Sequence, residues 1–128
     1  GLDISDTMIA SAQKRLIGKL NINFISTDGI SYPVSSDSVD FVFSFIVFQH
    51  MPDKATVEKN FEEARRVLKN GGIMKVQIRG LPSSKSEWFY GPSFNMKQVK
   101  KMLDRLSLQI IKSEGEDQMY FWLWLEKY

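Results

Sequence analysis

The sequence predicts an α/β fold: a mostly parallel sheet that ends in an antiparallel strand. Apolar runs rich in β-branched and aromatic residues alternate with segments whose apolar residues recur at helical spacing. The run from Val39 to Phe48 is nearly all apolar, which is typical of a strand buried on both faces inside a parallel sheet. The last two apolar runs are separated only by the short turn 114–117, so we expect them to pair antiparallel.

The N-terminal segment predicts a strand, a helix and a second strand. Residues 2–4 form the first strand, and the Ser5 hydroxyl can accept a hydrogen bond from a free amide of the helix that follows. Gly18 is the expected end of that helix, because glycine readily adopts the left-handed conformation found after many helices. The short apolar segment 22–26 predicts the second strand.

A longer helix is expected after the central strand. Asp53 is its expected N-cap, and Glu62 and Arg66 are spaced for an ion pair across one turn. The Asn-Gly-Gly sequence at 70–72 is expected to end the helix in a left-handed conformation, and 73–78 is the next strand. The apolar residues at helical spacing are expected to be buried: Val57, Phe61, Ala64 and Leu68.

The C-terminal segment predicts a third helix and the final two strands. Residues 80–93 form a long loop, and a helix with an apolar face begins at Met96. Strands are expected at 108–111 and 119–125. Both faces of the last strand are apolar, so we expect it to lie inside the sheet. Two of its residues are expected in the core: Trp122 and Trp124.

Composition limits the class of protein. The 128 residues suit one domain, 1–128, and 43% hydrophobic with 25% charged residues is ordinary for a soluble globular protein. A net charge of +2 is too small to predict a nucleic-acid partner, and no run of 18 apolar residues predicts a membrane span. One histidine and no cysteine exclude a multi-histidine or thiolate metal site in one chain, so we expect no metal. The lack of cysteine and of a secretory signal predicts a cytoplasmic protein.

Polar side chains gather where the central strand ends. Ser44, Gln49 and His50 stand near its carboxyl end, which is where open α/β sheets bind ligands. Histidine is the side chain best suited to accept a proton near neutral pH, so His50 is the candidate catalytic base. The alternative is that His50 only forms hydrogen bonds that shape the loop after the strand.

Several stretches together resemble the class I S-adenosylmethionine-dependent methyltransferases. Residues 1–5, Gly-Leu-Asp-Ile-Ser, resemble their second strand, and Asp28 with 40–42, Asp-Phe-Val, resembles their third and fourth strands. The runs 50–53, His-Met-Pro-Asp, and 66–72, Arg-Val-Leu-Lys-Asn-Gly-Gly, resemble the small-molecule methyltransferase branch. The resemblance covers almost the whole chain and implies a Rossmann-like sheet with an antiparallel final strand.

The resemblance also implies an S-adenosylmethionine site. Asp3 would accept hydrogen bonds from the ribose hydroxyls, and Asp28 would accept one from the adenine amino group. The remaining cofactor contacts are expected from Ile4, Gly29, Ile30, Ser44 and Phe45. The small-molecule methyl acceptor is expected to contact Gln49, Trp88 and Tyr90.

One part of the family pattern is missing from this sequence. There is no Gly-x-Gly-x-Gly turn and no strand before it, and the resemblance places that strand between 2–4 and the central strand. We therefore expect an N-terminally truncated, partial domain that binds the cofactor poorly when alone. A missing N-terminal segment or a second copy in a homodimer would complete the sheet, since unpaired strand edges favour association.

Two other functions stay open. An acid after a strand, as at Asp3, also suits the ribose of NAD, so an NAD-dependent oxidoreductase is one alternative. The missing glycine-rich turn favours the other, a non-catalytic remnant or interaction module. The leading hypothesis is a methyltransferase that acts on a small molecule by in-line transfer, with no nucleic-acid or membrane partner.

Overall fold

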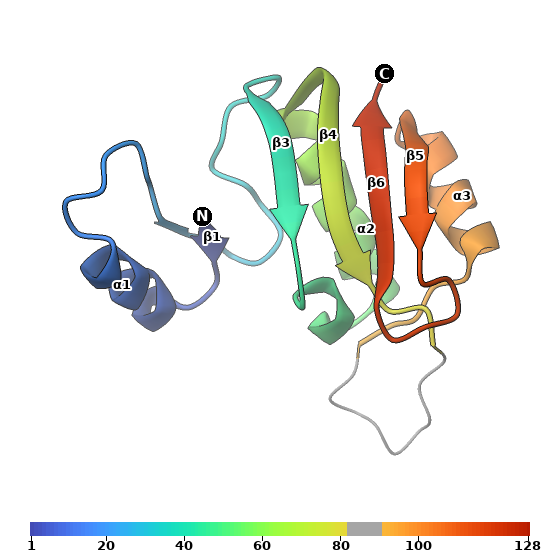
Figure 1. Cartoon of the computed structure of the whole chain (residues 1–128), viewed down its shortest axis with the longest axis horizontal. Coiled ribbons are helices and arrows are strands. Elements are labelled where there is room, and N and C mark those ends of the chain that lie inside the picture. The colour runs from blue at the N-terminus through green and yellow to red at the C-terminus, as the bar shows by residue number, and fades with distance from the viewer. Residues whose placement is uncertain (82–90) are drawn as a thin grey trace.

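The computed structural model describes residues 1–81 and 91–128 and shows an α/β fold (Figure 1). In chain order the elements are β1 Leu2–Asp3, α1 Asp6–Arg15, β2 Ile25–Ser26, β3 Val39–Ser44, the 3₁₀ turn η1 Phe48–His50, α2 Lys54–Val67, β4 Leu68–Ile78, α3 Met96–Arg105, β5 Leu108–Glu114 and β6 Phe121–Lys127. The predicted fold class is confirmed. Within these two ranges, no helix is both long enough and apolar enough to cross a membrane.

The main sheet has four strands in the order β3-β4-β6-β5. β3 and β4 run parallel, whereas β6 runs antiparallel to both β4 and β5, which confirms the prediction for the last strand. β1 and β2 form a separate parallel pair beyond β3, next to α1 (Figure 1). In the described part of the chain no ladder joins this pair to β3, so the strand order is interrupted there.

Helices α2 and α3 pack against one face of the main sheet (Figure 1). Asp53 caps α2 by accepting a hydrogen bond from the Thr56 N–H at 2.7 Å, as predicted. Asn95 and Gln98 form a capping box at the start of α3. The buried stripe predicted for α2 is also confirmed. Buried apolar residues from the helices and the sheet form the core: Val57, Phe61, Ala64, Leu68, Met74, Val76, Val99, Leu123 and Leu125.

No helix covers the opposite face of the main sheet in the described residues (Figure 1). That face carries aromatic side chains. Phe41 and Phe43 are 55% and 57% exposed, so the prediction that the central strand is buried on both faces is wrong. Successive side chains of a strand point to opposite faces, and only the face toward α2 is covered. Trp122 and Trp124 lie on the open face and are half-buried instead of fully in the core, with the Trp122 ring stacked on Phe43 and Phe45.

The central strand is shorter than predicted. β3 ends at Ser44 instead of Phe48, because Ile46 turns the chain with a φ of 57° and η1 follows. A β-branched residue rarely adopts this left-handed conformation, so apolar composition alone gives no sign of the turn. β2 is also shorter than the predicted 22–26 and contains only Ile25–Ser26.

The junction between α2 and β4 also differs from the prediction. The chain passes directly from helix to strand at Leu68, and the Asn-Gly-Gly sequence expected to end the helix lies inside β4. Gly71 there has a φ of 75°, and the register with β3 shifts at this point, as in a β-bulge. Arg66 pairs with Glu63 instead of the predicted Glu62, with Nε 2.6 Å from Oε1.

Candidate functional site

A cleft of about 1250 Å³ lies between the β1–β2 pair and β3. Its walls come from the ends of β1 and β2, the segment that leads to β3, and the turn after β3. All the cofactor residues predicted from the sequence line it: Asp3, Ile4, Asp28, Gly29, Ile30, Ser44 and Phe45. The structure therefore brings into one cavity residues that lie far apart in the sequence.

Asp3 is positioned by the strand before it and the helix after it. Its backbone carbonyl accepts a hydrogen bond from the Thr27 N–H at 2.9 Å, which holds β1 beside β2. Its carboxylate Oδ1 accepts from the Ser5 N–H at 2.8 Å, and the Ser5 hydroxyl accepts from the Met8 N–H to cap α1 as predicted. Among the described residues no hydrogen bond reaches Oδ2, so this oxygen can accept from a ligand.

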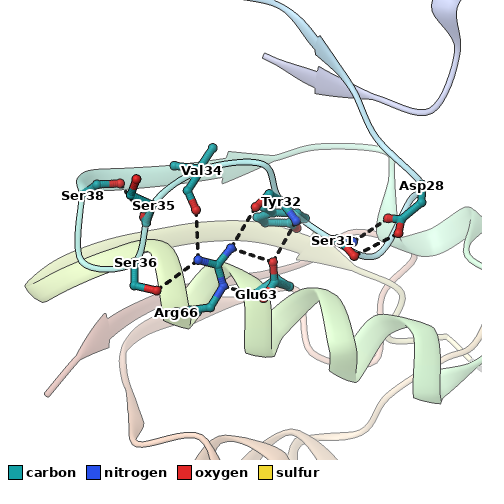
Figure 2. Close-up of polar contacts among 9 residues, drawn as sticks. All are labelled: Asp28, Ser31, Tyr32, Val34, Ser35, Ser36, Ser38, Glu63 and Arg66. Atoms are coloured by element: carbon teal, nitrogen blue, oxygen red, sulfur yellow. Dashed lines mark hydrogen bonds and ion pairs between the residues drawn. The ribbon is translucent and has the colours of Figure 1, made fainter.

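Asp28 organises the turn after β2. Its Oδ1 accepts from the Ile30 N–H at 2.9 Å. The same oxygen accepts from the Ser31 N–H at 2.6 Å, and Oδ2 accepts from the Ser31 hydroxyl at 2.9 Å (Figure 2). The backbone bond from Ser31, followed by those from Ile30 and the Ser31 hydroxyl, holds the pKa of the Asp28 carboxyl below its ordinary value. Asp28 therefore stays charged near neutral pH, and a ligand would share its carboxylate with the turn.

Gly29 brings this turn close to the first strand. A Cβ at Gly29 would lie 3.0 Å from Ile4 Cγ2, and the residue has a φ of 83°, so both space and conformation favour glycine. The Gly29 carbonyl accepts from Asn60 Nδ2 at 3.0 Å, and Asn60 Oδ1 accepts from the Tyr32 hydroxyl at 3.1 Å. Asn60 is buried in α2, at 3% exposed, so these hydrogen bonds hold the turn at Gly29 against the helix. It is not predicted from the sequence, where its only signal is a polar side chain beside the apolar stripe of α2.

Arg66 of α2 fastens the segment that leads from this turn to β3 (Figure 2). Its guanidinium donates to the carbonyl oxygens of Tyr32 and Val34 at 2.8 and 2.9 Å. Glu63 accepts from Arg66 Nε at 2.6 Å and from the Tyr32 N–H at 2.8 Å. The hydrogen bond from Arg66 lowers the pKa of Glu63, while burial, followed by the charge of Glu63, raises the pKa of Tyr32 to about 12.

The other wall of the cleft is the carboxyl end of β3. Ser44 is half-buried there, and Phe45 is 46% exposed with its ring stacked on Trp122 at a centroid distance of 5.2 Å. These positions are compatible with contacts to the methionine part of a cofactor. The contacts themselves stay a prediction.

Gln49 and His50 both lie in η1 but in different surroundings. His50 is exposed and lines the cleft, whereas Gln49 is 4% exposed and does not line it. The Gln49 side chain accepts from Gln77 Nε2 at 2.9 Å and places its own Nε2 3.0 Å from His50 Nε2. A substrate contact for Gln49 stays a prediction. Trp88 and Tyr90, the other two residues predicted to contact the methyl acceptor, lie outside the described residues.

Known proteins are similar to this chain in sequence. Residues 1–76, more than half of the chain, match the family model described as a methyltransferase domain. Phosphoethanolamine N-methyltransferase 2 of Caenorhabditis elegans is 34% identical over 82 residues, which cover 62% of this chain and 18% of the relative. The chain therefore corresponds to a small part of that longer protein.

Solved structures share the fold at low sequence identity. A protein from Pyrococcus horikoshii superposes with a TM-score of 0.77 at 18% identity, covering 100% of this chain and 70% of that one. An S-adenosylmethionine-dependent methyltransferase from Methanosarcina mazei superposes with a TM-score of 0.75 at 17% identity, covering 99% and 80%. A third, from Mesorhizobium loti, gives 0.72 at 14% identity, covering 99% and 79%. The chain belongs to the methyltransferase domain family, and its fold is that of the class I S-adenosylmethionine-dependent methyltransferases.

Proposed function

We propose that this domain takes a methyl group from S-adenosylmethionine and transfers it to a small molecule. One observation carries the proposal: a single cleft has Asp3 and Asp28 on one wall and Ser44 on the other. The walls come from the carboxyl ends of β1 and β2 on one side and of β3 on the other, where the strand order is interrupted. Open α/β sheets bind ligands at such a point. Membership of the methyltransferase domain family supports the same function.

The residues of the cleft suit an adenosyl group. Asp3 Oδ2 can accept a hydrogen bond from a ribose hydroxyl, and the charged Asp28 can accept one from the adenine amino group. Ile4 and Ile30 are 71% and 36% exposed and offer apolar surfaces to a purine ring. The cleft, at about 1250 Å³, exceeds the roughly 300–1,000 Å³ of ordinary ligand sites, and part of its volume is the slot between β1 and β3.

The chain's own residues would mainly bind and orient the reactants. S-adenosylmethionine, when bound, would supply a methyl group bonded to a positively charged sulfur. The acceptor atom would attack the methyl carbon in line, and the sulfur would be the leaving group. The protein has to hold that acceptor in line and keep water away from it. His50 lies on the cleft wall, where a contact with the acceptor is feasible. The similarity to a phosphoethanolamine N-methyltransferase makes small amines the first acceptors to test.

In the proposed enzyme a further strand fills the slot between β1 and β3. The described parts of these strands are not hydrogen-bonded to each other, and open strand edges favour pairing. An upstream segment or a second copy of the chain could supply the strand. The sequence lacks the glycine-rich turn that lets backbone approach a cofactor closely, so the chain alone should bind S-adenosylmethionine weakly.

Thermal melting with three ligands tests the function. We expect S-adenosylmethionine and S-adenosylhomocysteine at millimolar concentration to raise the melting temperature, and NAD to leave it unchanged. A rise with NAD alone would contradict the proposal and favour an oxidoreductase. A non-catalytic interaction module would be favoured if no ligand raised the melting temperature, either of this chain or of a longer chain that supplies the missing strand. The open aromatic face and the missing glycine-rich turn also favour that function.

A further inference from the structure

The backbone N–H groups of the turn after β2 are already used within the chain. The Gly29 N–H donates to Thr27 Oγ1 at 3.1 Å. The next two N–H groups, those of Ile30 and Ser31, both donate to Asp28 Oδ1. A ring nitrogen of a purine has to accept a hydrogen bond, so it needs a donor from elsewhere in the cleft unless one of these bonds breaks.

Two of the three hydroxyl groups of residues 27–32 also have their hydrogens in use. The Ser31 hydroxyl donates to Asp28 Oδ2 at 2.9 Å, as Figure 2 shows. The Tyr32 hydroxyl donates to Asn60 Oδ1 at 3.1 Å. Neither of these hydroxyls can therefore donate to a ligand without giving up a bond that holds the turn.

The third hydroxyl, that of Thr27, keeps its hydrogen available. One of its lone pairs accepts from the Gly29 N–H, and no bond from its hydrogen to another group is found in residues 1–81 and 91–128. A hydroxyl has one hydrogen and two lone pairs, so Thr27 can donate to a ligand and keep its bond to Gly29. Thr27 is half-buried and lines the cleft, so a ligand bound there can reach this donor.

Thr27 lies next to both acids of the cleft. Its N–H donates to the Asp3 carbonyl oxygen at 2.9 Å, which holds it beside the residue proposed for the ribose. Asp28 follows it in the chain, and the two side chains accept from consecutive N–H groups of one turn, those of Gly29 and Ile30. The Thr27 hydroxyl and the Asp28 carboxylate therefore lie beside each other and present a donor next to a charged acceptor.

A donor next to an acceptor matches the hydrogen-bonding groups of adenine. The amino group of adenine donates, and the ring nitrogens on its two sides, one in each ring, accept. Hypoxanthine has an oxygen in place of the amino group, so it would set one acceptor against another at Asp28. A site that bonds to a polar group of its ligand rejects an analogue that lacks the group, because the polar side chain is left unpaired.

We propose that the Thr27 hydroxyl donates to a ring nitrogen of the bound adenine, next to the amino group that donates to Asp28, and that this pair makes the cleft specific for adenine. The role rests on the proposed function, because it requires an adenosyl ligand in the cleft. The competing donor to the ring is a backbone N–H. That of Gly29 becomes available only when its bond to Thr27 breaks, so the two possibilities respond differently to the loss of the hydroxyl.

Base analogues of S-adenosylhomocysteine test the proposal on the unmodified chain, by chemical-shift titration. We use the 1-deaza and 7-deaza analogues, in which a C–H group replaces one of the two ring nitrogens beside the amino group. One of them should bind about three to ten times more weakly than the parent, which corresponds to the loss of one hydrogen bond. The hypoxanthine analogue should also bind more weakly than the parent. Equal binding of the hypoxanthine analogue, or of both deaza analogues, would overturn the proposal.

Thr27→Val removes the hydroxyl and keeps the shape of the side chain. We expect this variant to bind S-adenosylhomocysteine more weakly, and to bind the parent and the disfavoured deaza analogue equally. Thr27→Ser keeps a hydroxyl and should restore both the affinity and the discrimination. Thr7→Val is the matched control, because Thr7 is exposed on α1 and does not line the cleft. Thr27→Val also frees the Gly29 N–H, so unchanged or tighter binding would assign the ring nitrogen to a backbone N–H and overturn the proposal.

The results also separate this proposal from the proposed function. If S-adenosylhomocysteine binds in the cleft and Thr27→Val binds it as tightly as the unmodified chain does, the proposed function stands and the role of Thr27 is wrong. If S-adenosylhomocysteine causes no shift, either in this chain or in a longer chain that supplies the missing strand, the proposed function is wrong and the role of Thr27 with it.

Discussion

Asp3 and Asp28 face the same cleft because β1 and β2 run parallel, with Asp3 paired directly to Ser26. The carboxyl ends of parallel strands meet at one edge of a sheet, so acids that follow two neighbouring strands face a shared space. The relationship meets the main requirement of a nucleoside site: one acid for the ribose and another for the base. Ile4 and Ile30 line the cleft beside the two acids.

Asp3→Asn should weaken the binding of S-adenosylhomocysteine about tenfold, or about 1.4 kcal/mol, because an amide is a poorer acceptor for ribose hydroxyls than a carboxylate. Calorimetric titration measures the change. Asp6→Asn is the control, since Asp6 is an exposed acid in the first turn of α1 that does not line the cleft. Equal losses in the two variants would show that net charge, not a ribose contact, drives binding.

Arg66→Met should lower the urea concentration at the midpoint of unfolding, because it removes charged hydrogen bonds to Glu63 and to two backbone carbonyls. Urea unfolding followed by circular dichroism measures the effect. Lys59→Met, an exposed substitution on α2, should change stability little. If both variants are equally stable, Arg66 does not fasten the segment before β3.

Acid should destabilise the fold partly through Glu63. The pKa of Glu63 in the folded chain lies below its ordinary value. The ionised carboxylate therefore stabilises the fold fully above the unfolded pKa of about 4.3. This stabilisation is lost as the pH falls through the lower pKa of the folded chain. Glu63→Gln should therefore flatten the decline of the urea midpoint below about pH 5. The neighbouring exposed acid supplies the control, since Glu62→Gln should keep the slope of the unmodified chain.

The open aromatic face should make the chain self-associate. Phe41 and Phe43 are more than half exposed beside the half-buried Trp122, and contiguous apolar surface of this kind favours association. Phe43→Ser should shift the sedimentation profile toward the monomer. Leu20→Ser removes a side chain that is 85% exposed and lies outside the main sheet, so it should leave the profile unchanged. A monomeric unmodified chain at high concentration would refute this prediction.

The sequence predicts the order of elements because this order depends on local patterns, whereas the candidate cofactor residues follow from the family resemblance and stay a prediction. Apolar periodicity marks α2 and β6, and Asp3 and Asp28 each follow an apolar segment at a strand end. The turn at Ile46 is missed because it depends on a hydrogen bond to Gln77, 31 positions away. Glycine at 71 is equally suited to a helix end and a bulge, and only the pairing of β4 with β3 decides between them.

The sequence does not predict the hydrogen bonds between α2 and the segment 29–34, for a similar reason. Asn60 and Arg66 look like surface polar residues, and their roles appear only when the segment 29–34 folds back on the helix. The exposure of Phe41 and Phe43 likewise depends on what lies over the sheet, which the sequence of the strand does not encode.

Chemical-shift mapping of the nitrogen-labelled chain with S-adenosylhomocysteine tests the central claim most directly, because NMR detects even weak binding. We predict that the largest shifts on titration occur at Asp3 and Ile4, at Asp28 to Ile30, and at Ser44 and Phe45, the residues that line the two walls of the cleft. Shifts confined to other surfaces, such as the exposed side of α3, or none at millimolar ligand in a chain that carries the completing strand, would contradict the assignment of this cleft to the cofactor.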